Sequence, residues 1–130
     1  MRTSPVRPLI AAGIWLSLTA AVQTPVPAEH IDAVKASPAN FTLLLENEHV
    51  RVIEYAIRPG ERDQWHTHPA RVSYVVSAGT VRVTTSDGRS LVFEEKAGDT
   101  TWSEPAPRHF VENIGPTPVK TILVEVKERP

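Results

Sequence analysis

The chain of 130 residues contains no cysteine, so it can form neither a disulfide nor a lipid-modified cysteine. It also lacks an excess of one charge sign, because 14 basic and 15 acidic residues give a formal net charge of −1. No basic stripe occurs along the sequence, which argues against nucleic-acid binding. Helical periodicity is missing as well, so we expect a fold built from strands and stabilised by its core and by any metal it binds.

The N-terminal segment, residues 1–21, has the composition of an export signal. Arg2 and Arg7 form a basic region, residues 9–18 form an apolar stretch, and residues 19–21 are small enough for a cleavage site. The apolar stretch is too short to span a bilayer, so we expect an exported protein, periplasmic or secreted, without a stable membrane anchor. Anchoring through this segment is the competing interpretation. Removal of the segment leaves 12 basic and 15 acidic residues, a formal charge of −3.

The rest of the chain divides into an arm and one domain. Residues 22–40 contain Pro25, Pro27 and Pro38 with few large apolar side chains, which predicts a linker or N-terminal arm. Residues 41–130 are sufficient for a single packed domain and too few for a second one.

The predicted domain is all-β, because short alternating segments are separated by turn sequences throughout. A Pro-Gly pair at Pro59 and Gly60 and an Asp-Gly pair at Asp87 and Gly88 are typical turns. A set of this size suggests a jelly roll or closed β-barrel, since an open sheet would expose its edges. The expected strands cover residues 41–45, 50–57, 64–68, 71–77, 80–85, 90–95, 100–103, 109–113 and 119–126.

Three histidines predict a metal site. His66 and His68 are two residues apart in an extended segment, which places both imidazoles on one face of a strand. His109 begins a later strand after a proline-rich turn at residues 105–107 and is the natural third ligand. We expect one divalent transition metal; imidazole donors leave iron, zinc, manganese, nickel and copper open.

Gln64 lies two residues before His66 and therefore on the same strand face. Its side-chain oxygen could be a weak fourth ligand or a hydrogen-bond partner of bound water, and thus a catalytic candidate. A polar cavity wall is the alternative interpretation.

The first histidine segment resembles the first motif of the cupin family. That motif has a glycine, five residues, a His-x-His pair, a carboxylate, six residues and another glycine, and its fixed positions fall on Gly60, His66, His68, Val72 and Gly79. Valine thus replaces the metal-binding glutamate of the family. The second motif is similar over residues 98–113; glycine, histidine and asparagine are kept at Gly98, His109 and Asn113, and the usual proline and inner glycine are replaced by Glu104 and Ala106.

The resemblance implies a cupin-type jelly-roll β-barrel whose metal is held by three neutral imidazoles. Neutral ligands leave the full charge of the ion for binding an anion or polarising a carbonyl. Tyr74 shares the strand face of Val72, so in this barrel it is expected to point into the cavity and donate to a substrate, with a core aromatic as the alternative.

Three functions follow as hypotheses. The first is a mononuclear metal-dependent enzyme, an oxygenase or lyase, acting on a small organic acid or other polar metabolite. The second is a non-catalytic barrel of the cell envelope that binds a small ligand or a metal. The third is a barrel without metal that forms a homodimer through residues 22–40.

Overall fold

The computed structural model describes residues 20–21 and 29–128. Within these residues the chain forms one helical turn and nine strands. Their bounds are α1 (Ala33–Ala36), β1 (Phe41–Glu46), β2 (Val50–Ile57), β3 (His66–His68), β4 (Arg71–Ser77), β5 (Gly79–Thr85), β6 (Ser90–Glu95), β7 (Thr100–Ser103), β8 (Ala106–Asn113) and β9 (Val119–Val126).

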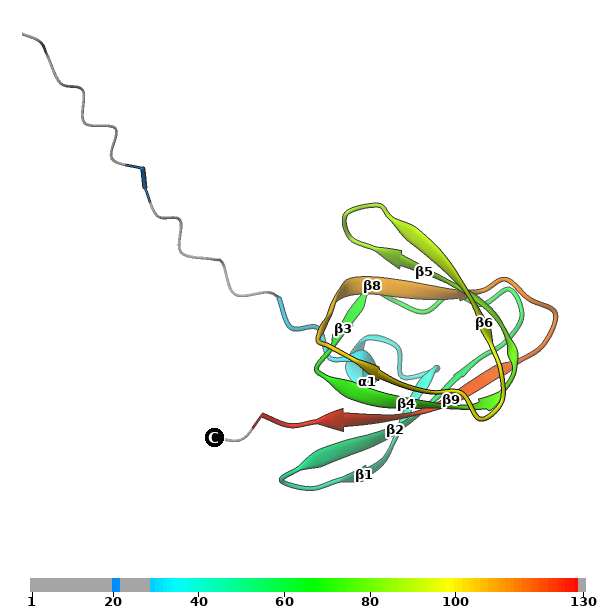
Figure 1. Cartoon of the computed structure of the whole chain (residues 1–130), viewed down its shortest axis with the longest axis horizontal. Coiled ribbons are helices and arrows are strands. Elements are labelled where there is room, and N and C mark those ends of the chain that lie inside the picture. The colour runs from blue at the N-terminus through cyan, green and yellow to red at the C-terminus, as the bar shows by residue number, and fades with distance from the viewer. Residues whose placement is uncertain (1–19, 22–28, 129–130) are drawn as a thin grey trace, which may run out of the picture.

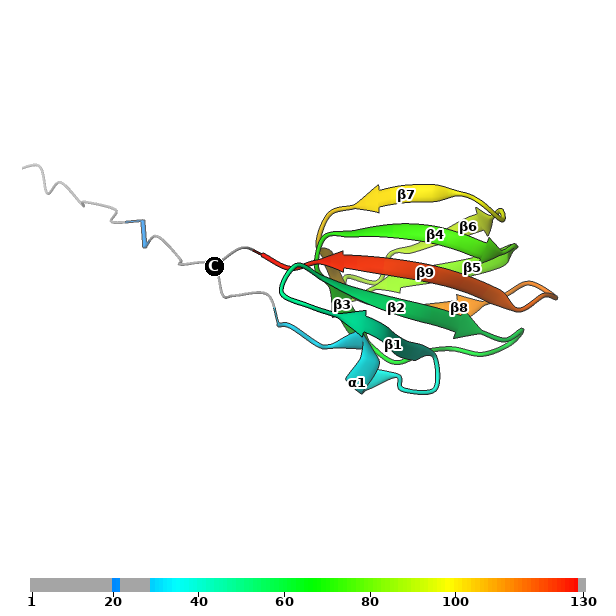
Figure 2. The same cartoon turned by 90° about the horizontal axis from the view of Figure 1, so that it is seen from below.

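The strands form two antiparallel sheets that face each other (Figure 1). One sheet has the order β1-β2-β9-β4-β7, which can be followed from one edge to the other in Figure 2, and the second has the order β3-β8-β5-β6. All paired strands are antiparallel, so the hydrogen-bonded ladders leave side chains alternating between the space inside and the outer surface. The prediction of a mostly-β single domain is confirmed.

The core lies between the two sheets. In β2, the alternate residues Ile53, Tyr55 and Ile57 are buried, and in β9 the inward face includes Val119 and Leu123. Phe41 stacks on Tyr55 with ring centroids 4.6 Å apart. Phe41 also lies against the rings of His66 and His68 on β3, with centroids 5.0 and 5.7 Å away, so the apolar core borders the polar groups of β3.

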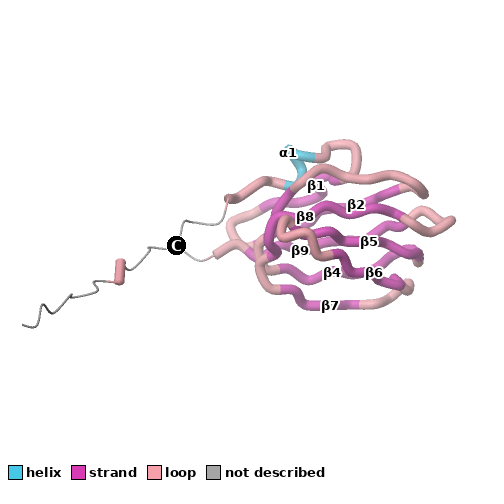
Figure 3. The backbone as a smooth tube through the Cα atoms, turned by 90° about the horizontal axis from the view of Figure 1, so that it is seen from above, coloured by secondary structure: helices cyan, strands magenta, loops and turns pink. Residues whose placement is uncertain are grey.

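The segment before β1 packs onto the barrel. α1 contacts both β1 and β3, and Figure 3 shows it beside β1 at the edge of the molecule. Asp32 caps the helical turn by accepting a hydrogen bond from the amide of Lys35, and forms an isolated bridge with Thr67 of β3. Ala33 is part of the core cluster. The last residues of the predicted arm therefore cover β3 from outside; residues 22–28 lie outside the described residues.

An apolar row crosses the outer face of the five-stranded sheet. Register pairing aligns four of its members side by side: Leu45, Val52, Val124 and Val72. Trp102, the register partner of Val72 on the edge strand β7, continues the row and also borders the cavity between the sheets. Val72 and Val124 thus lie on the face opposite to their neighbours Ser73 and Leu123, which line the space between the sheets.

A strand forms at each of the nine predicted places; the main differences are a helical turn and two strand bounds. β3 begins at His66 and not at residue 64. The helical turn α1 was not predicted, because four residues are too few to show a helical period. β8 begins at Ala106, so part of the predicted turn at residues 105–107 is strand. The ladder between β3 and β8 is irregular at this point, pairing His66 with His109 but His68 with Ala106, and such an irregularity accommodates Pro107.

The predicted export signal, residues 1–21, lies outside the described residues except for residues 20–21. Among the described residues, no helix combines the length and the apolar character that crossing a membrane requires.

Candidate metal centre

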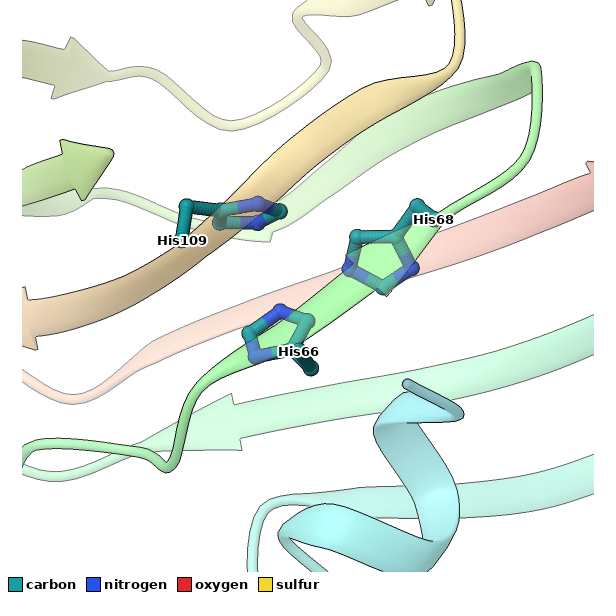
Figure 4. Close-up of side chains that lie close together, drawn as sticks. All are labelled: His66, His68 and His109. Atoms are coloured by element: carbon teal, nitrogen blue, oxygen red, sulfur yellow. The ribbon is translucent and has the colours of Figure 1, made fainter. Parts of the chain in front are cut away.

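His66, His68 and His109 meet inside the barrel, as their spacing predicted. His66 and His68 lie on β3, and His109 is the direct register partner of His66 on the neighbouring strand β8. Figure 4 shows the three rings turned toward one another from these two strands. Their potential ligand nitrogens all lie within 4.8 Å of one another, and all three side chains are buried.

Each of the three rings is fixed from behind through its Nδ1 atom. The Nδ1 of His66 lies 2.7 Å from the carbonyl oxygen of Gln64, and that of His109 lies 2.7 Å from the carbonyl oxygen of Pro107. The Nδ1 of His68 lies 2.8 Å from Oε1 of Glu125. Because carbonyl and carboxylate oxygens only accept, each Nδ1–H donates, and this tautomer leaves a free lone pair on every Nε2.

Burial keeps the three imidazoles neutral. It lowers the pKa of His66 to about 3, with the neighbouring His68 as the next cause, and it also lowers the pKa values of His68 and His109. The Nε2 of His66 is buried and has no hydrogen-bond partner among the described residues. A buried lone pair without a donor is costly, and a cation bound there would satisfy it. The residues present therefore fit a divalent metal.

A second layer of buried groups holds β3 and β8 in place. Asp63 is fully buried, accepts hydrogen bonds from the hydroxyl of Tyr55 at 3.0 Å and the amide of Val111 at 2.7 Å, and lies 3.8 Å from the Nδ1 of His66. Burial raises the pKa of Asp63 to about 6. Asn113 joins the same region by donating to the carbonyl oxygen of Ile57 at 3.0 Å. These bonds join the two sheets directly beside the histidines.

The histidines line a cavity of about 590 Å³ between the sheets. Its two ends differ in charge. The histidine end contains Arg71, whereas the end near Val75 contains Glu95 and Asp99, since Asp99 accepts a backbone hydrogen bond from Val75. Burial and the nearby Asp99 raise the pKa of Glu95. The wall between the ends carries hydroxyl and apolar side chains, among them Ser73, Val83, Thr101, Ser103, Val111 and Thr121.

Val72, the residue counted at the carboxylate position of the motif, does not line the cavity; its neighbours Arg71 and Ser73 do. The chain passes from the four-stranded to the five-stranded sheet at residues 69–70, between β3 and β4, so the inward alternation of β3 does not continue into β4. An irregularity between Val75 and Ser77 adds a further shift before Gly79. The expectation that Val72 faces the cavity was therefore wrong, because it continued the alternation of β3 into β4.

Tyr74 and Gln64 do not occupy the places predicted for them. Tyr74 has the same orientation as Val72, is 49% exposed and lies outside the cavity lining, so it does not point into the cavity as expected. The side chain of Gln64 is exposed, because the residue precedes β3 and its extended alternation. Gln64 acts instead through its backbone carbonyl, which accepts from His66.

Sequence reasoning missed Arg71, Glu125 and Asp63. The only local signal for Glu125 was a carboxylate on the same strand face as Val119 and Leu123, which are buried. Its bond to His68 spans 57 residues, so no local pattern could predict it.

Comparisons with known proteins agree with this architecture. The chain is similar to a cupin domain from Bordetella pertussis, with 26% identity and a TM-score of 0.63 over 68% of this chain and 92% of that one. It is also similar to an RmlC-like cupin family protein with a double-stranded β-helix fold from Methanocaldococcus jannaschii, with 16% identity and a TM-score of 0.55 over 66% of this chain and 77% of that one. No curated protein matches the chain. The family model described as "Cupin domain" matches residues 53–125, and the chain therefore belongs to the cupin family.

Proposed function

We propose that this cupin binds one divalent transition-metal ion through the Nε2 atoms of His66, His68 and His109. The observation that carries the proposal is the common orientation of the rings, with every Nδ1 bonded from behind and the Nε2 of His66 left without a partner among the described residues. Imidazole donors suit zinc, copper, iron and nickel, so metal analysis has to identify the ion.

We further propose that the chain is a mononuclear metal-dependent enzyme, an oxygenase or lyase, acting on a small organic acid or similar polar metabolite. A metal held by three neutral ligands would supply Lewis acidity and open coordination positions. The protein's own contribution is binding and orientation: the cavity of about 590 Å³ admits a small molecule, and its hydroxyl groups can orient polar substituents. Export of the chain, expected from residues 1–21, would place this reaction outside the cytoplasm.

A second candidate function is a non-catalytic barrel that binds a small ligand. The observation that favours it is the placement of the carboxylates. Asp63 accepts hydrogen bonds from Tyr55 and Val111, and Glu125 accepts from the Nδ1 of His68, so neither carboxylate lines the cavity. Glu95 lies at the far end of the cavity. A general base beside the histidines is thus missing among the described residues.

Metal analysis of the full chain, purified without chelators, tests the first proposal. We expect about one ion per chain in the wild type and in His49→Ala, whose histidine is exposed and far from the cluster in sequence. His66→Ala and His109→Ala should each lose stoichiometric metal while remaining folded by circular dichroism. Unchanged metal content in both variants would show that the site is elsewhere.

Turnover of a panel of small acids then separates the two functions. The metal-loaded chain is incubated with each acid while oxygen consumption and product formation are followed. Oxygen uptake indicates an oxygenase, and cleavage without oxygen uptake indicates a lyase. Binding without any turnover across the panel would support the non-catalytic barrel.

A further inference from the structure

Arg71 is a charged side chain that the proposed metal site does not use. It is the first residue of β4, and it lines the cavity at the same end as the three histidines. Its Nε and Nη1 atoms are buried and have no hydrogen-bond partner among the described residues. These two atoms carry three of the five N–H donors of the guanidinium group, and a buried donor left unpaired is costly.

No described carboxylate neutralises Arg71 within 4.0 Å. Glu125 is its register partner on β9, and its charge acts on Arg71 without a direct ion pair. Oε1 of Glu125 accepts from His68, and Oε2, which is buried without a hydrogen-bond partner among the described residues, lies 3.5 Å from Nη1 of Arg51. Asp99 and Glu95 line the same cavity at its other end. The backbone carbonyl of Asp99 accepts from the amide of Val75, which lies four residues along β4 from Arg71. Four residues of strand separate two positions by about 13 Å, too far for an ion pair.

The groups that line this end of the cavity are therefore neutral or positive, and the carboxylate of Glu125 lies behind His68, outside the lining. The three imidazoles are neutral, the guanidinium carries one positive charge, and a bound divalent ion would add two more. A small anion with several acceptor lone pairs would satisfy the guanidinium donors and complete the coordination of the ion at once.

We propose that Arg71 is the anchor for a carboxylate group of the ligand, and that the cavity takes a small organic-acid anion, its carboxylate bound to the guanidinium and an adjacent oxygen directed to the histidine site. Only the contact between the ligand's adjacent oxygen and the histidine site rests on the proposed metal site. The first contact, between carboxylate and guanidinium, requires only Arg71. The hydroxyl-lined wall and the acidic far end leave room for polar, hydrogen-donating groups on the rest of the molecule.

The test compares ligand binding in four chains by calorimetry: the wild type, Arg71→Lys, Arg71→Met and a matched control, Arg82→Met. Arg82 is also on a strand but pairs with Glu112 at 3.7 Å and does not line the cavity. The probes are pyruvate, its neutral amide and inorganic phosphate, each titrated into zinc-loaded and metal-free protein. Metal affinity is measured separately by competition with a chromophoric chelator.

We expect Arg71→Met to weaken pyruvate binding by about 10- to 100-fold, the effect of removing a charged hydrogen-bond partner, and Arg71→Lys to restore part of it. Arg82→Met should bind pyruvate as the wild type does. The neutral amide should bind weakly and equally to all four chains. Pyruvate bound equally by the wild type and Arg71→Met, or not bound by the wild type, would overturn the proposal. Equal dependence of phosphate binding on Arg71 would overturn the assignment to carboxylates.

The melting temperature of the ligand-free protein distinguishes a binding role of Arg71 from a structural one. If Arg71 is kept for binding, its replacement by the apolar methionine removes an unpaired buried charge, and the ligand-free variant should melt at the same or a higher temperature than the wild type. A clear decrease in melting temperature would show that Arg71 serves the fold. The experiment separates this proposal from the proposed metal site. A protein that does not bind metal is detected by the chelator competition, whereas the effect of Arg71 on pyruvate binding is also measured in metal-free protein.

Discussion

The two polar groups at the inner end of the cavity differ in how the protein supports them. Every histidine is bonded from behind, by the carbonyl groups of Gln64 and Pro107 or by Glu125, and points a free nitrogen inward. Arg71, on the opposite sheet, has no such partner for its Nε and Nη1 among the described residues. The protein thus orients three neutral imidazoles toward the cavity and leaves the guanidinium of Arg71 without a hydrogen-bond partner for these two nitrogens. This difference supports both proposals, a cation bound by the histidines and an anion bound by Arg71 at the same end of the cavity.

The largest expected effect concerns the neutrality of the histidines in metal-free protein. A buried histidine whose pKa is about 3 in the folded state and 6.5 when unfolded contributes stability that is present above pH 6.5 and is lost as the pH falls toward 3. For His66 alone the loss is on the order of 5 kcal/mol. Asp63 opposes it, because a carboxyl whose folded pKa is raised to about 6 adds stability as the pH falls from 6 to 3.8.

The pKa values of Glu95 and Glu125 are raised as well, so three histidines are opposed by three carboxyl groups. Because the pKa values of the histidines are lowered from well above pH 4.5, we still expect the free energy of unfolding of the metal-free chain to fall, by a few kcal/mol, between pH 7 and pH 4.5. Urea denaturation at both pH values measures it. The variant His66→Asn should show a weaker pH dependence. An identical dependence in this variant would mean that His66 is not held neutral by burial.

Metal binding should be the next largest effect. Free zinc at 100 times its dissociation constant should raise the free energy of unfolding by about 2.7 kcal/mol, because the ion binds only the folded chain. His68→Ala removes one of three ligands and should abolish this increase at the same zinc concentration. Thermal melts with and without zinc provide the measurement, and an equal increase in the variant would place the ion elsewhere.

Weakening the hydrogen bond to the Nδ1 of a ligand histidine should lower metal affinity less than removing the histidine does. Glu125→Gln keeps an acceptor for the Nδ1–H of His68 but removes its charge, and we expect metal affinity to fall by about 10- to 100-fold. Glu112→Gln is the control, because the carboxylate of Glu112 pairs with Arg82 and does not line the cavity. Chelator competition measures the metal affinity of both variants. Equal metal affinities would show that Glu125 does not position the imidazole of His68.

The smallest effect is expected at Val72. Because its side chain faces outward with the apolar row, Val72→Glu should leave metal affinity unchanged within about twofold, the scatter expected of a surface substitution. The same competition assay measures it. A clear gain in affinity would show that Val72 does face the ion and that the orientation of β4 is different.

Much of the fold and part of the site could be predicted from the sequence. Strand alternation and turn residues predicted all nine strands, and the same period of two placed His66 and His68 on one face. The third ligand, His109, followed from its position at a strand after a turn. Each of these features depends on neighbours within a few residues.

The features that could not be predicted depend on long-range geometry. The face of β4 that points inward is set where the chain changes sheets at residues 69–70, so Val72 and Tyr74 were placed inside although Arg71 and Ser73 line the cavity. The roles of Glu125 and Asp63 depend on contacts with strands far away in sequence. Tertiary packing decides such contacts, and the pattern of a single strand does not identify the partner residue.

X-ray absorption spectroscopy of the zinc-loaded chain tests the central claim most directly, because it counts the imidazoles bound to the ion. The account predicts three nitrogen ligands from histidine at about 2.0–2.1 Å, reduced to two in His109→Ala. A spectrum with one imidazole or none, or one that His109→Ala leaves unchanged, would contradict it.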